Sequence, residues 1–295
     1  MDLDGVLVVD KPEGWTSHDV VAKVRRIAGT KRVGHLGTLD PIATGVLPLV
    51  IGSATRLAQF YIRSDKVYEG TVRFGWSTDS YDRAGVPTSS PKAVTLDRQE
   101  LEAVLERFRG EFLQTPPPVS AKKVDGRRAY ELARKAVAVE LAPVPVQVYE
   151  LTALEVSGSD ARLRVHCSGG TYVRSIAHEL GEALKCGAHL LELRRVASGE
   201  FDLAKARTPA QLESLAADGR LADALVPPEQ LLPGFPAVYV EDRVAVEIRN
   251  GRNFPASPFR AQPGARHVKA LNRQGKLLAI GEAVLPHVYH PMVVF

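Results

Sequence analysis

A single carboxylate lies in a loop of unusual composition near the N-terminus. The segment 34–45 (GHLGTLDPIATG) surrounds Asp40 with three glycines, two threonines and one histidine, and contains no second acid. Glycine permits a close approach of the backbone to a ligand, and Pro41 restricts the turn directly after the acid. Five basic residues at 23–32 precede the loop and an apolar run at 46–51 follows it. The pattern predicts an acid displayed beside a basic groove, and so chemistry on a polyanion; an Asp-Pro turn without a chemical role is the alternative.

A second polar segment, 167–174 (CSGGTYVR), places an aromatic residue and an arginine in the first turn of a predicted helix. Thr171 is a suitable N-cap for this helix, which we expect to run to about Lys185. Because the N-terminus of a helix attracts anions, Arg174 would face either a phosphate or a buried carboxylate there. An ordinary surface salt bridge is the alternative for Arg174.

The rest of the chain argues against several other kinds of site. The eight histidines show no metal-binding spacing, and Cys167 and Cys186 are too few for a zinc site or a disulfide scaffold. No Gly-Lys-Ser/Thr closes a phosphate-binding loop, and no nucleophile-elbow pattern indicates acyl transfer. No apolar run approaches the roughly 20 residues that span a membrane. Since the N-terminus also lacks a signal-peptide pattern, we expect a cytosolic protein without a metal.

Positive charge is concentrated in two segments. The net charge of the 295 residues is +4, and residues 241–295 hold eight Lys/Arg against four Asp/Glu, so the first 240 residues are neutral overall. Within 120–136, six basic residues stand against two acids. Two basic patches on a neutral background indicate a nucleic-acid-binding protein, although two solvated surfaces have the same composition.

Apolar periodicity and capping signals predict the elements that position these residues. Helices are expected at 16–28, 54–62, 97–110, 129–138 and 171–185, and from Pro209 onward. Strands are expected at 6–9, 47–51, 66–76, 144–156 and 161–167; the alternation in 66–76 makes Tyr68 a core aromatic by default. The Pro-rich stretch 227–236 is the best candidate for a linker. Strands and helices interleave without a regular βαβ rhythm, so the fold class is mixed α+β.

Together these segments resemble the TruB family of tRNA pseudouridine synthases. The resemblance covers about residues 6–203 and is carried, in order, by 10–17 (DKPEGWTS), 34–45, Tyr68 with 78–82 (TDSYD), 116–134, 168–175 and 187–195. Order and spacing make it specific, because no single short pattern carries it. Three positions depart from the family pattern: Leu36, Ala136 and Glu179. None is the central acid, and Ala136 bears only on how the insertion described next bends.

The resemblance implies a mixed, largely antiparallel central sheet with flanking helices, the pseudouridine synthase fold. A catalytic domain would cover 1–232, with an RNA-gripping insertion at about 116–140. A small, mostly β, PUA-like RNA-binding domain would follow at 237–295. The implied activity is isomerisation of uridine to pseudouridine at position 55 in the T-loop of tRNA. It would need no cofactor, metal, guide RNA or protein partner, and the enzyme would be a cytoplasmic monomer.

The resemblance also implies catalytic roles for three residues. Asp40 would be the essential carboxylate, and Arg174 the cation that keeps it ionised. Tyr68 would lie near the C5 proton that must leave the base. Three routes stay open for Asp40: it would attack the sugar, attack the base, or remove a proton from the ribose.

The remaining matched positions would bind a target base that is flipped out of its stack. The substrate-binding positions are His35, Tyr68, Tyr172, Leu193 and Lys11. His35 would brace the vacated stack and Leu193 would close the pocket, whereas Lys11 would fix the loop or a phosphate. Backbone phosphates of the RNA would be bound by Lys122, Lys123, Arg127 and Arg128.

Three other functions fit part of the pattern. A non-catalytic RNA-binding protein would carry the same basic patches. A guide-dependent synthase would share the aspartate loop, but the insertion favours an enzyme that grips its substrate alone. A glycosylase would break the same bond and release free uracil.

Overall fold

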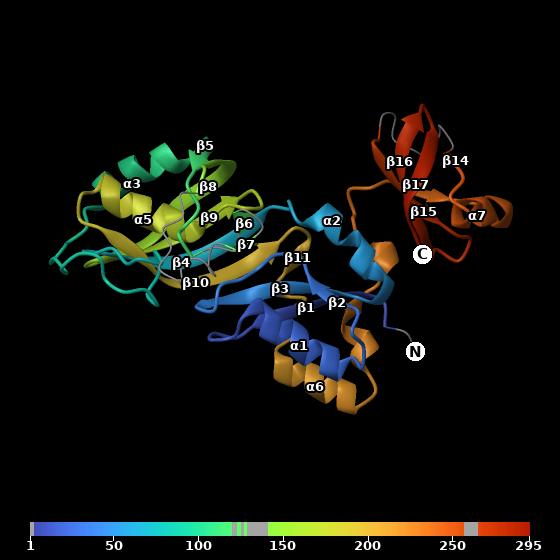
Figure 1. The fold of residues 1–295 in the computed structure, drawn as a ribbon, viewed down its shortest axis with the longest axis horizontal. Coiled ribbons are helices and arrows are strands. Elements are labelled where there is room, and N and C mark those ends of the chain that lie inside the picture. Colours follow the sequence, from blue (N-terminus) through green and yellow to red (C-terminus); the bar gives the residue numbers. More distant parts are fainter. Residues whose placement is uncertain (1–2, 120–122, 125–126, 129–140, 257–264) are drawn as a thin grey trace.

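The computed structural model describes residues 3–119, 123–124, 127–128, 141–256 and 265–295 (Figure 1). The strands of its larger sheet are β1 (Gly5–Lys11), β2 (Val33–His35), β3 (Ala43–Ile51), β4 (Lys66–Phe74), β5 (Gly110–Gln114), β8 (Val144–Ser157), β9 (Asp160–Cys167), β10 (Ala188–Ser198), β11 (Phe201–Asp202) and β12 (Leu225–Val226). Their order is β12-β1-β3-β10-β4-β9-β8-β5, with β2 beside β3 and β11 beside β10. Among the described pairs of this sheet, only β3 and β10 run parallel. The predicted mixed, largely antiparallel α+β fold is confirmed.

The middle of this sheet brings together residues that are far apart in the sequence. Burial alternates along β4, so Lys66 and Tyr68 project from the same face of the strand. Tyr68 lies opposite Arg195 of the antiparallel neighbour β10, and Leu193 of β10 lies opposite Ala43 at the start of β3. Strand β10 was not among the predicted elements, because its charged residues interrupt the apolar alternation.

Helices cover the sheet, and capping signals correctly predict where three of them begin, after Thr16, Asp97 and Thr208. The helices are α1 (Ser17–Ile27), α2 (Ala58–Tyr61), α3 (Arg98–Leu105), α5 (Val173–Ala183), α6 (Pro209–Ala217) and α7 (Asp242–Arg249). Thr16 and Thr208 each form a complete capping box, at α1 and α6 respectively. These two helices pack against each other beside β1, whereas α3 and α5 pack together at the other end of the sheet (Figure 1).

Three of the helix predictions need correction. Thr171 does not cap α5: the N-cap is Tyr172, whose amide is satisfied by the side chain of Gln114 instead. The segment predicted as one helix at 54–62 is a 3₁₀ helix over Gly52–Leu57 followed by the single turn of α2. Helix α3 passes through a 3₁₀ turn into β5, a strand that was not predicted. The helix predicted at 129–138 lies outside the described residues.

The C-terminal region forms a second sheet at one end of the molecule (Figure 1). Its strands are β13 (Ala237–Tyr239), β14 (Phe254–Pro255), β15 (His267–Leu271), β16 (Leu277–Leu285) and β17 (Val288–Val294), in the order β13-β15-β16-β17-β14. Its inner face meets the first sheet through a shared apolar cluster that includes Val6, Leu57, Leu231 and Ile280. Lys269 of β15 adds hydrogen bonds to the backbone of the preceding linker.

No helix in the described part of the chain is both long enough and apolar enough to cross a membrane.

Candidate active site

The loop that carries Asp40 connects β2 to β3 and is fixed by hydrogen bonds to Ser17, the first residue of α1. The Ser17 hydroxyl donates to the carbonyl of Leu39 at 3.0 Å and accepts from the amide of the same residue at 2.8 Å. Ser17 is buried, so water cannot take over either hydrogen bond if it is lost. The backbone next to Asp40 is therefore held at a fixed distance from α1.

Lys11 is fully buried beneath the same loop. Its ammonium donates to the carbonyls of Trp15 at 2.6 Å, Pro12 at 2.9 Å and Pro41 at 3.4 Å. Burial lowers the pKa of Lys11 to about 8, and the negative charge of Asp40 opposes this shift. Lys11 thus joins the end of β1 to the residue that follows Asp40.

Arg195 of β10 supports the loop from the opposite side. Its Nε donates to the carbonyl of Val46 at 2.7 Å, and its two Nη groups donate to those of Gly37 at 3.1 Å and Thr38 at 3.3 Å. Gly45 lies beside Arg195 with a φ of +99°. A Cβ atom at this position would lie only 2.2 Å from the Arg195 carbonyl oxygen, so only glycine fits there.

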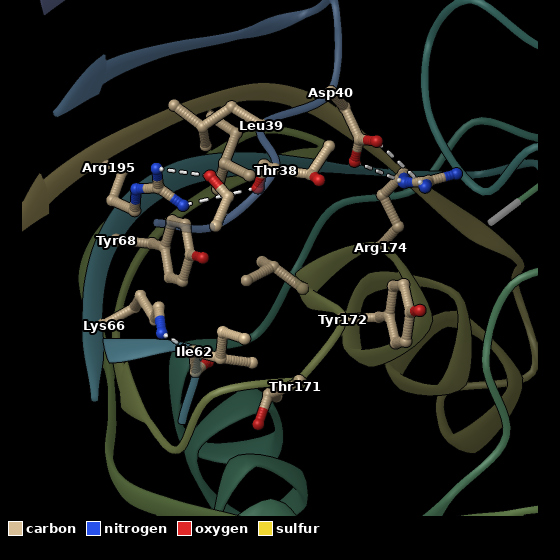
Figure 2. A pocket seen from close by; sticks show the side chains of 14 residues that line it. Thr38, Leu39, Asp40, Ile62, Lys66, Tyr68, Thr171, Tyr172, Arg174 and Arg195 are labelled. Carbon is tan, nitrogen blue, oxygen red and sulfur yellow. Dashed lines mark hydrogen bonds and ion pairs between the residues drawn. The ribbon is translucent and has the colours of Figure 1, made fainter. Parts of the chain in front are cut away.

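Asp40 forms a two-point ion pair with Arg174 (Figure 2). The Arg174 Nε is 2.9 Å from Oδ2 of Asp40, and its Nη2 is 3.2 Å from Oδ1. The arginine side chain is 5% exposed, whereas the carboxylate is 35% exposed. Because the guanidinium fork matches the geometry of a carboxylate, the pair fixes the orientation of Asp40 and leaves it accessible from one side. Of the two partners considered for Arg174, the structure contains the carboxylate.

Further acceptors hold Arg174 in place. Its Nη1 donates to the carbonyl of Ser80 at 2.9 Å and its Nη2 to that of Val119 at 3.0 Å. Oδ2 of the buried Asp82 lies 3.7 Å from its Nε, and Asp82 itself accepts from the Ser80 hydroxyl at 2.7 Å. The turn at 78–82 therefore fixes the position of Arg174, which in turn orients Asp40.

Asp40 and Arg174 lie at one end of a pocket of about 210 Å³. Its walls come from the Asp40 loop, β4, β10 and the start of α5. Figure 2 shows Lys66, Tyr68 and Arg195 on the side opposite Arg174. Pockets for drug-sized ligands are usually roughly 300–1,000 Å³, so this one suits a single small ring.

Tyr68 and Tyr172 are held in the pocket wall in different ways. Tyr68 is buried, and burial raises the pKa of its hydroxyl, with the Arg195 charge opposing the shift. The backbone of Tyr172 is fixed by the fully buried Gln114, whose Oε1 accepts from the Tyr172 amide at 2.8 Å. The Gln114 Nε2 donates back to the Tyr172 carbonyl at 3.1 Å. This pair of bonds sets the first turn of α5, which carries Arg174.

The structure places five predicted site residues around one pocket: Asp40, Tyr68, Tyr172, Arg174 and Leu193. Lys11 lies beneath the loop rather than in the pocket lining, and His35 lies on β2, where its Nδ1 accepts from the Gly37 amide at 3.3 Å. Lys122 is outside the described residues. Lys123, Arg127 and Arg128 are described only as backbone, in the two-residue strands β6 (Lys123–Val124) and β7 (Arg127–Arg128), so their RNA contacts stay predictions.

Three residues of the site were not predicted. Lys66 could have been found from the alternation that put Tyr68 on one face of its strand, because the two residues are two positions apart. Arg195 was part of a recognised segment, but its role depends on the pairing of β10 with β3 and β4. Gln114 carries no local signal, because its partner Tyr172 is 58 residues away.

Among the described residues, no group of three His, Cys, Asp or Glu side chains is placed to hold a metal ion. A carboxylate at the mouth of a small pocket can serve as a nucleophile, as a general base or as a stabiliser of developing positive charge. The aromatic and aliphatic walls fit a planar ring, and the arginine keeps the carboxylate aimed at it. The arrangement suits chemistry on a base and the sugar attached to it.

Comparisons with known proteins match the whole chain. Residues 25–173 match the model of the N-terminal domain of TruB family pseudouridylate synthases, and residues 174–233 match that of the tRNA pseudouridylate synthase B C-terminal domain. A protein of Solibacter usitatus named tRNA pseudouridine synthase B is 71% identical over 292 residues, which cover 99% of this chain and all of the relative. A protein of the same name from Geobacillus thermodenitrificans is 41% identical over 301 residues, with 99% and 100% coverage.

Solved structures show the same likeness. An archaeal box H/ACA Nop10–Cbf5 complex contains a chain with a TM-score of 0.74 and 26% identity, covering 99% of this chain and 86% of that one. An H/ACA ribonucleoprotein bound to a substrate RNA containing 2′-deoxyuridine gives a TM-score of 0.75 and 26% identity, covering 99% and 85%.

Proposed function

The chain belongs to the TruB family of pseudouridylate synthases and isomerises uridine to pseudouridine in tRNA, and we propose that its target is uridine 55 of the T-loop, reached without a guide RNA. In this reaction the bond between N1 of uracil and C1′ of ribose breaks. The base turns, C5 bonds to C1′, the C5 proton leaves and N1 gains a proton. Atoms and electrons are conserved, so the enzyme is an isomerase and the reaction consumes no co-substrate.

We propose Asp40 as the essential carboxylate of this reaction. Its two-point contact with Arg174 supports the assignment, because that contact aims the carboxylate and leaves it partly open at the pocket mouth. The guanidinium of Arg174 places a permanent positive charge beside this carboxylate. Asp40 would meet the ribose side of the target nucleotide, where positive charge develops if the glycosidic bond breaks first.

The target base would be flipped out of the T-loop to enter the pocket. A base inside a folded loop is stacked, and extracting it costs a few kcal/mol. The pocket of about 210 Å³ supports a single flipped base as its occupant, with Tyr68 and Tyr172 against the uracil and Leu193 closing one wall. His35, which lies on β2 outside the pocket, would fill or brace the space that the base vacates.

RNA outside the pocket would be held by the basic insertion and by the C-terminal sheet. We propose that 237–295 is a PUA-like RNA-binding domain, separated from a catalytic domain over 1–232. The eight Lys/Arg of 241–295 support this role. Contacts to phosphates release counterions, so tRNA binding should weaken steeply as salt increases. We expect a cytoplasmic monomer without a protein partner.

The ion pair at the mouth of the pocket is the observation that carries this proposal. Its test is the incubation of the purified chain with an unmodified tRNA transcript, followed by mapping of pseudouridine along the RNA. The expected product is pseudouridine at position 55 alone, with no release of free uracil. Free uracil would instead identify a glycosylase, and binding without any modification would identify an RNA-binding protein.

A guide-dependent synthase is the second candidate, because chains in H/ACA ribonucleoproteins share the fold at 26% identity. The 71% identical relative is named for tRNA modification, which favours the stand-alone enzyme. Activity on the transcript alone would exclude the guide-dependent function. Activity only after a guide RNA is added would contradict our proposal.

A further inference from the structure

Lys66 is a buried cation in the pocket wall. The residue is 5% exposed, and its Nζ donates to the carbonyls of Ile62, at 3.3 Å, and Ser64. Within the described part of the chain, no carboxylate lies within ion-pair distance of this ammonium. Burial lowers the pKa of Lys66 to about 8; the positive charge of Arg195 adds to the shift, and Cys167 and Asp65 oppose it. A buried charge without an ion-pair partner destabilises a fold, so its presence calls for a reason other than stability.

The position of Lys66 relative to the other charged groups suggests that reason. Charged side chains in the lining comprise one carboxylate, Asp40, and three cations, Lys66, Arg174 and Arg195. Arg174 is committed to Asp40, and Arg195 donates to three carbonyls of the loop and of β3. A Cβ atom built on Gly37 would lie 3.6 Å from Nη1 of Arg195 and 3.7 Å from Cε of Lys66. Two positive charges therefore converge on one wall of the pocket, opposite Arg174 (Figure 2).

The chemistry of the reaction supplies a negative charge for this wall. If Asp40 attacks C1′ of the ribose, the bonding electron pair leaves with N1 and the uracil departs as an anion. If Asp40 removes a ribose proton, elimination expels the same anion. If Asp40 adds to C6 of the base, the ring electrons move onto C5 and O4. In all three routes the uracil ring becomes negative before C5 bonds to C1′.

We propose that Lys66 contacts the flipped uracil and stabilises the negative charge that its ring carries during the isomerisation. The inference rests on the proposed function, in which the target base occupies this pocket. Ile62 and Ser64 account for two of the three N–H groups of the ammonium, and the third would meet an oxygen of the uracil. A preorganised donor in a water-poor site is worth more than in solution, because it need not reorient as the charge forms.

The test compares Lys66→Met with Lys205→Met. Lys205 is a control of the same chemistry outside the pocket and outside the proposed RNA-binding segments, since it is exposed and its Nζ also donates to a backbone carbonyl, that of Glu200 at 3.3 Å. Single-turnover pseudouridine formation is measured at saturating enzyme on a T-arm RNA, with tRNA affinity measured in parallel. Loss of one such donor typically slows chemistry by about 10²–10³-fold. We expect a decrease of that size in Lys66→Met with near-normal affinity, and a normal rate in Lys205→Met. A rate for Lys66→Met within about threefold of the wild type would overturn the inference.

A substituted substrate separates charge stabilisation from a merely structural role. With 5-fluorouridine at the target position, the electron-withdrawing fluorine stabilises the ring anion by itself. The ratio of wild-type to Lys66→Met rates of target consumption should therefore be smaller than with uridine. An unchanged ratio would mean that Lys66 acts through the fold instead.

If Lys66→Met does not fold, the Asp40→Asn variant provides a second measurement, because it retains Lys66. The pH dependence of the ¹⁹F signal of a 5-fluorouracil bound at the target position gives the pKa of its N3 proton. A positive wall predicts a lower N3 pKa in the complex than in the free RNA, and an equal or higher value would contradict the inference. Wild-type activity on uridine is recorded in every series, so a failure of the proposed function is distinguished from a failure of the role of Lys66.

Discussion

Gln114 provides a sharp test of how the fold positions the site. Its amide is fully buried and makes two opposed hydrogen bonds to the backbone of Tyr172, accepting at 2.8 Å and donating at 3.1 Å. The Tyr172 carbonyl also accepts from Ile176 at 3.2 Å, so it keeps a partner if Gln114 is replaced. The Tyr172 amide would lose the acceptor that Gln114 provides. Because α5 begins there, the loss should loosen the turn that carries Arg174.

Two substitutions give different expected magnitudes. Gln114→Leu removes both hydrogen bonds between this buried side chain and Tyr172, and removing one partner of a buried hydrogen bond costs about 1–3 kcal/mol. Relaxation and water entry offset part of this, so we expect a loss of about 2–4 kcal/mol in the free energy of unfolding. Gln114→Glu depends on pH, because only the protonated acid has both the donor and the acceptor of the amide.

The sign of that dependence follows from burial. Burial raises the folded-state pKa of the carboxyl that Gln114→Glu introduces above the ordinary value of about 4.3. The stability of this variant should thus be close to wild type below pH 4 and should be lost as the pH rises toward the folded-state pKa. Urea unfolding between pH 4 and 8 measures this, with the exposed Gln59→Glu as the control expected to stay within about 0.5 kcal/mol. A Gln114→Glu variant equally stable across this range, with a normal rate of pseudouridine formation, would refute the positioning role.

Three further predictions concern the loop and the pocket wall. Gly45→Ala should destabilise the fold by at least about 3 kcal/mol, because the new Cβ would lie 2.2 Å from the Arg195 carbonyl oxygen. In the control Gly34→Ala, the new Cβ makes only an ordinary contact of 3.6 Å with Val50, so this variant should be tolerated. Thermal unfolding of both variants measures the difference. Ser17→Ala should lower stability by about 2–3 kcal/mol in urea and slow pseudouridine formation, since both hydrogen bonds to Leu39 are lost, and an unchanged rate would show that the loop needs no such support. Lys66 has a folded-state pKa of about 8, against 10.5 ordinarily, so the unfolded chain binds more protons between pH 8 and pH 10.5. The free energy of unfolding of the wild type should therefore rise over this range by up to about 3 kcal/mol relative to that of Lys66→Met. The same pH dependence of this free energy in both proteins from pH 7 to 10 would contradict the prediction.

The sequence was most informative where local chemistry determines local structure. The Thr16 and Thr208 caps and the alternation of β4 lead to the observed elements because each depends on residues within a few positions. The α5 cap was wrong because the N-cap lies one residue later, at Tyr172, whose backbone is held by two hydrogen bonds from a distant side chain, Gln114. A local pattern contains no information about such a partner.

The same limit applies to the site. From the residues alone, Asp40 and Arg174 were identified separately, with a phosphate or a buried carboxylate as the partner of the arginine; only the family resemblance paired the two. Their two-point contact depends on the pairing of β3 with β10 and on the packing of α5 against β10. Arg195 joins the pocket through strand register, which no short motif encodes, whereas the local alternation of β4 would have been enough to find Lys66. Family resemblance could transfer only those roles that the family pattern already marks.

The central claim is that Asp40 carries the chemistry, and Asp40→Asn tests it most directly. The amide keeps the size of the side chain but cannot act as a nucleophile or as a base. Single-turnover assays on an unmodified tRNA transcript should detect no pseudouridine at position 55, while tRNA binding and thermal stability stay close to wild type. The exposed Asp218→Asn provides a control of the same chemistry away from the pocket. Formation of pseudouridine by Asp40→Asn at a normal rate would contradict the account.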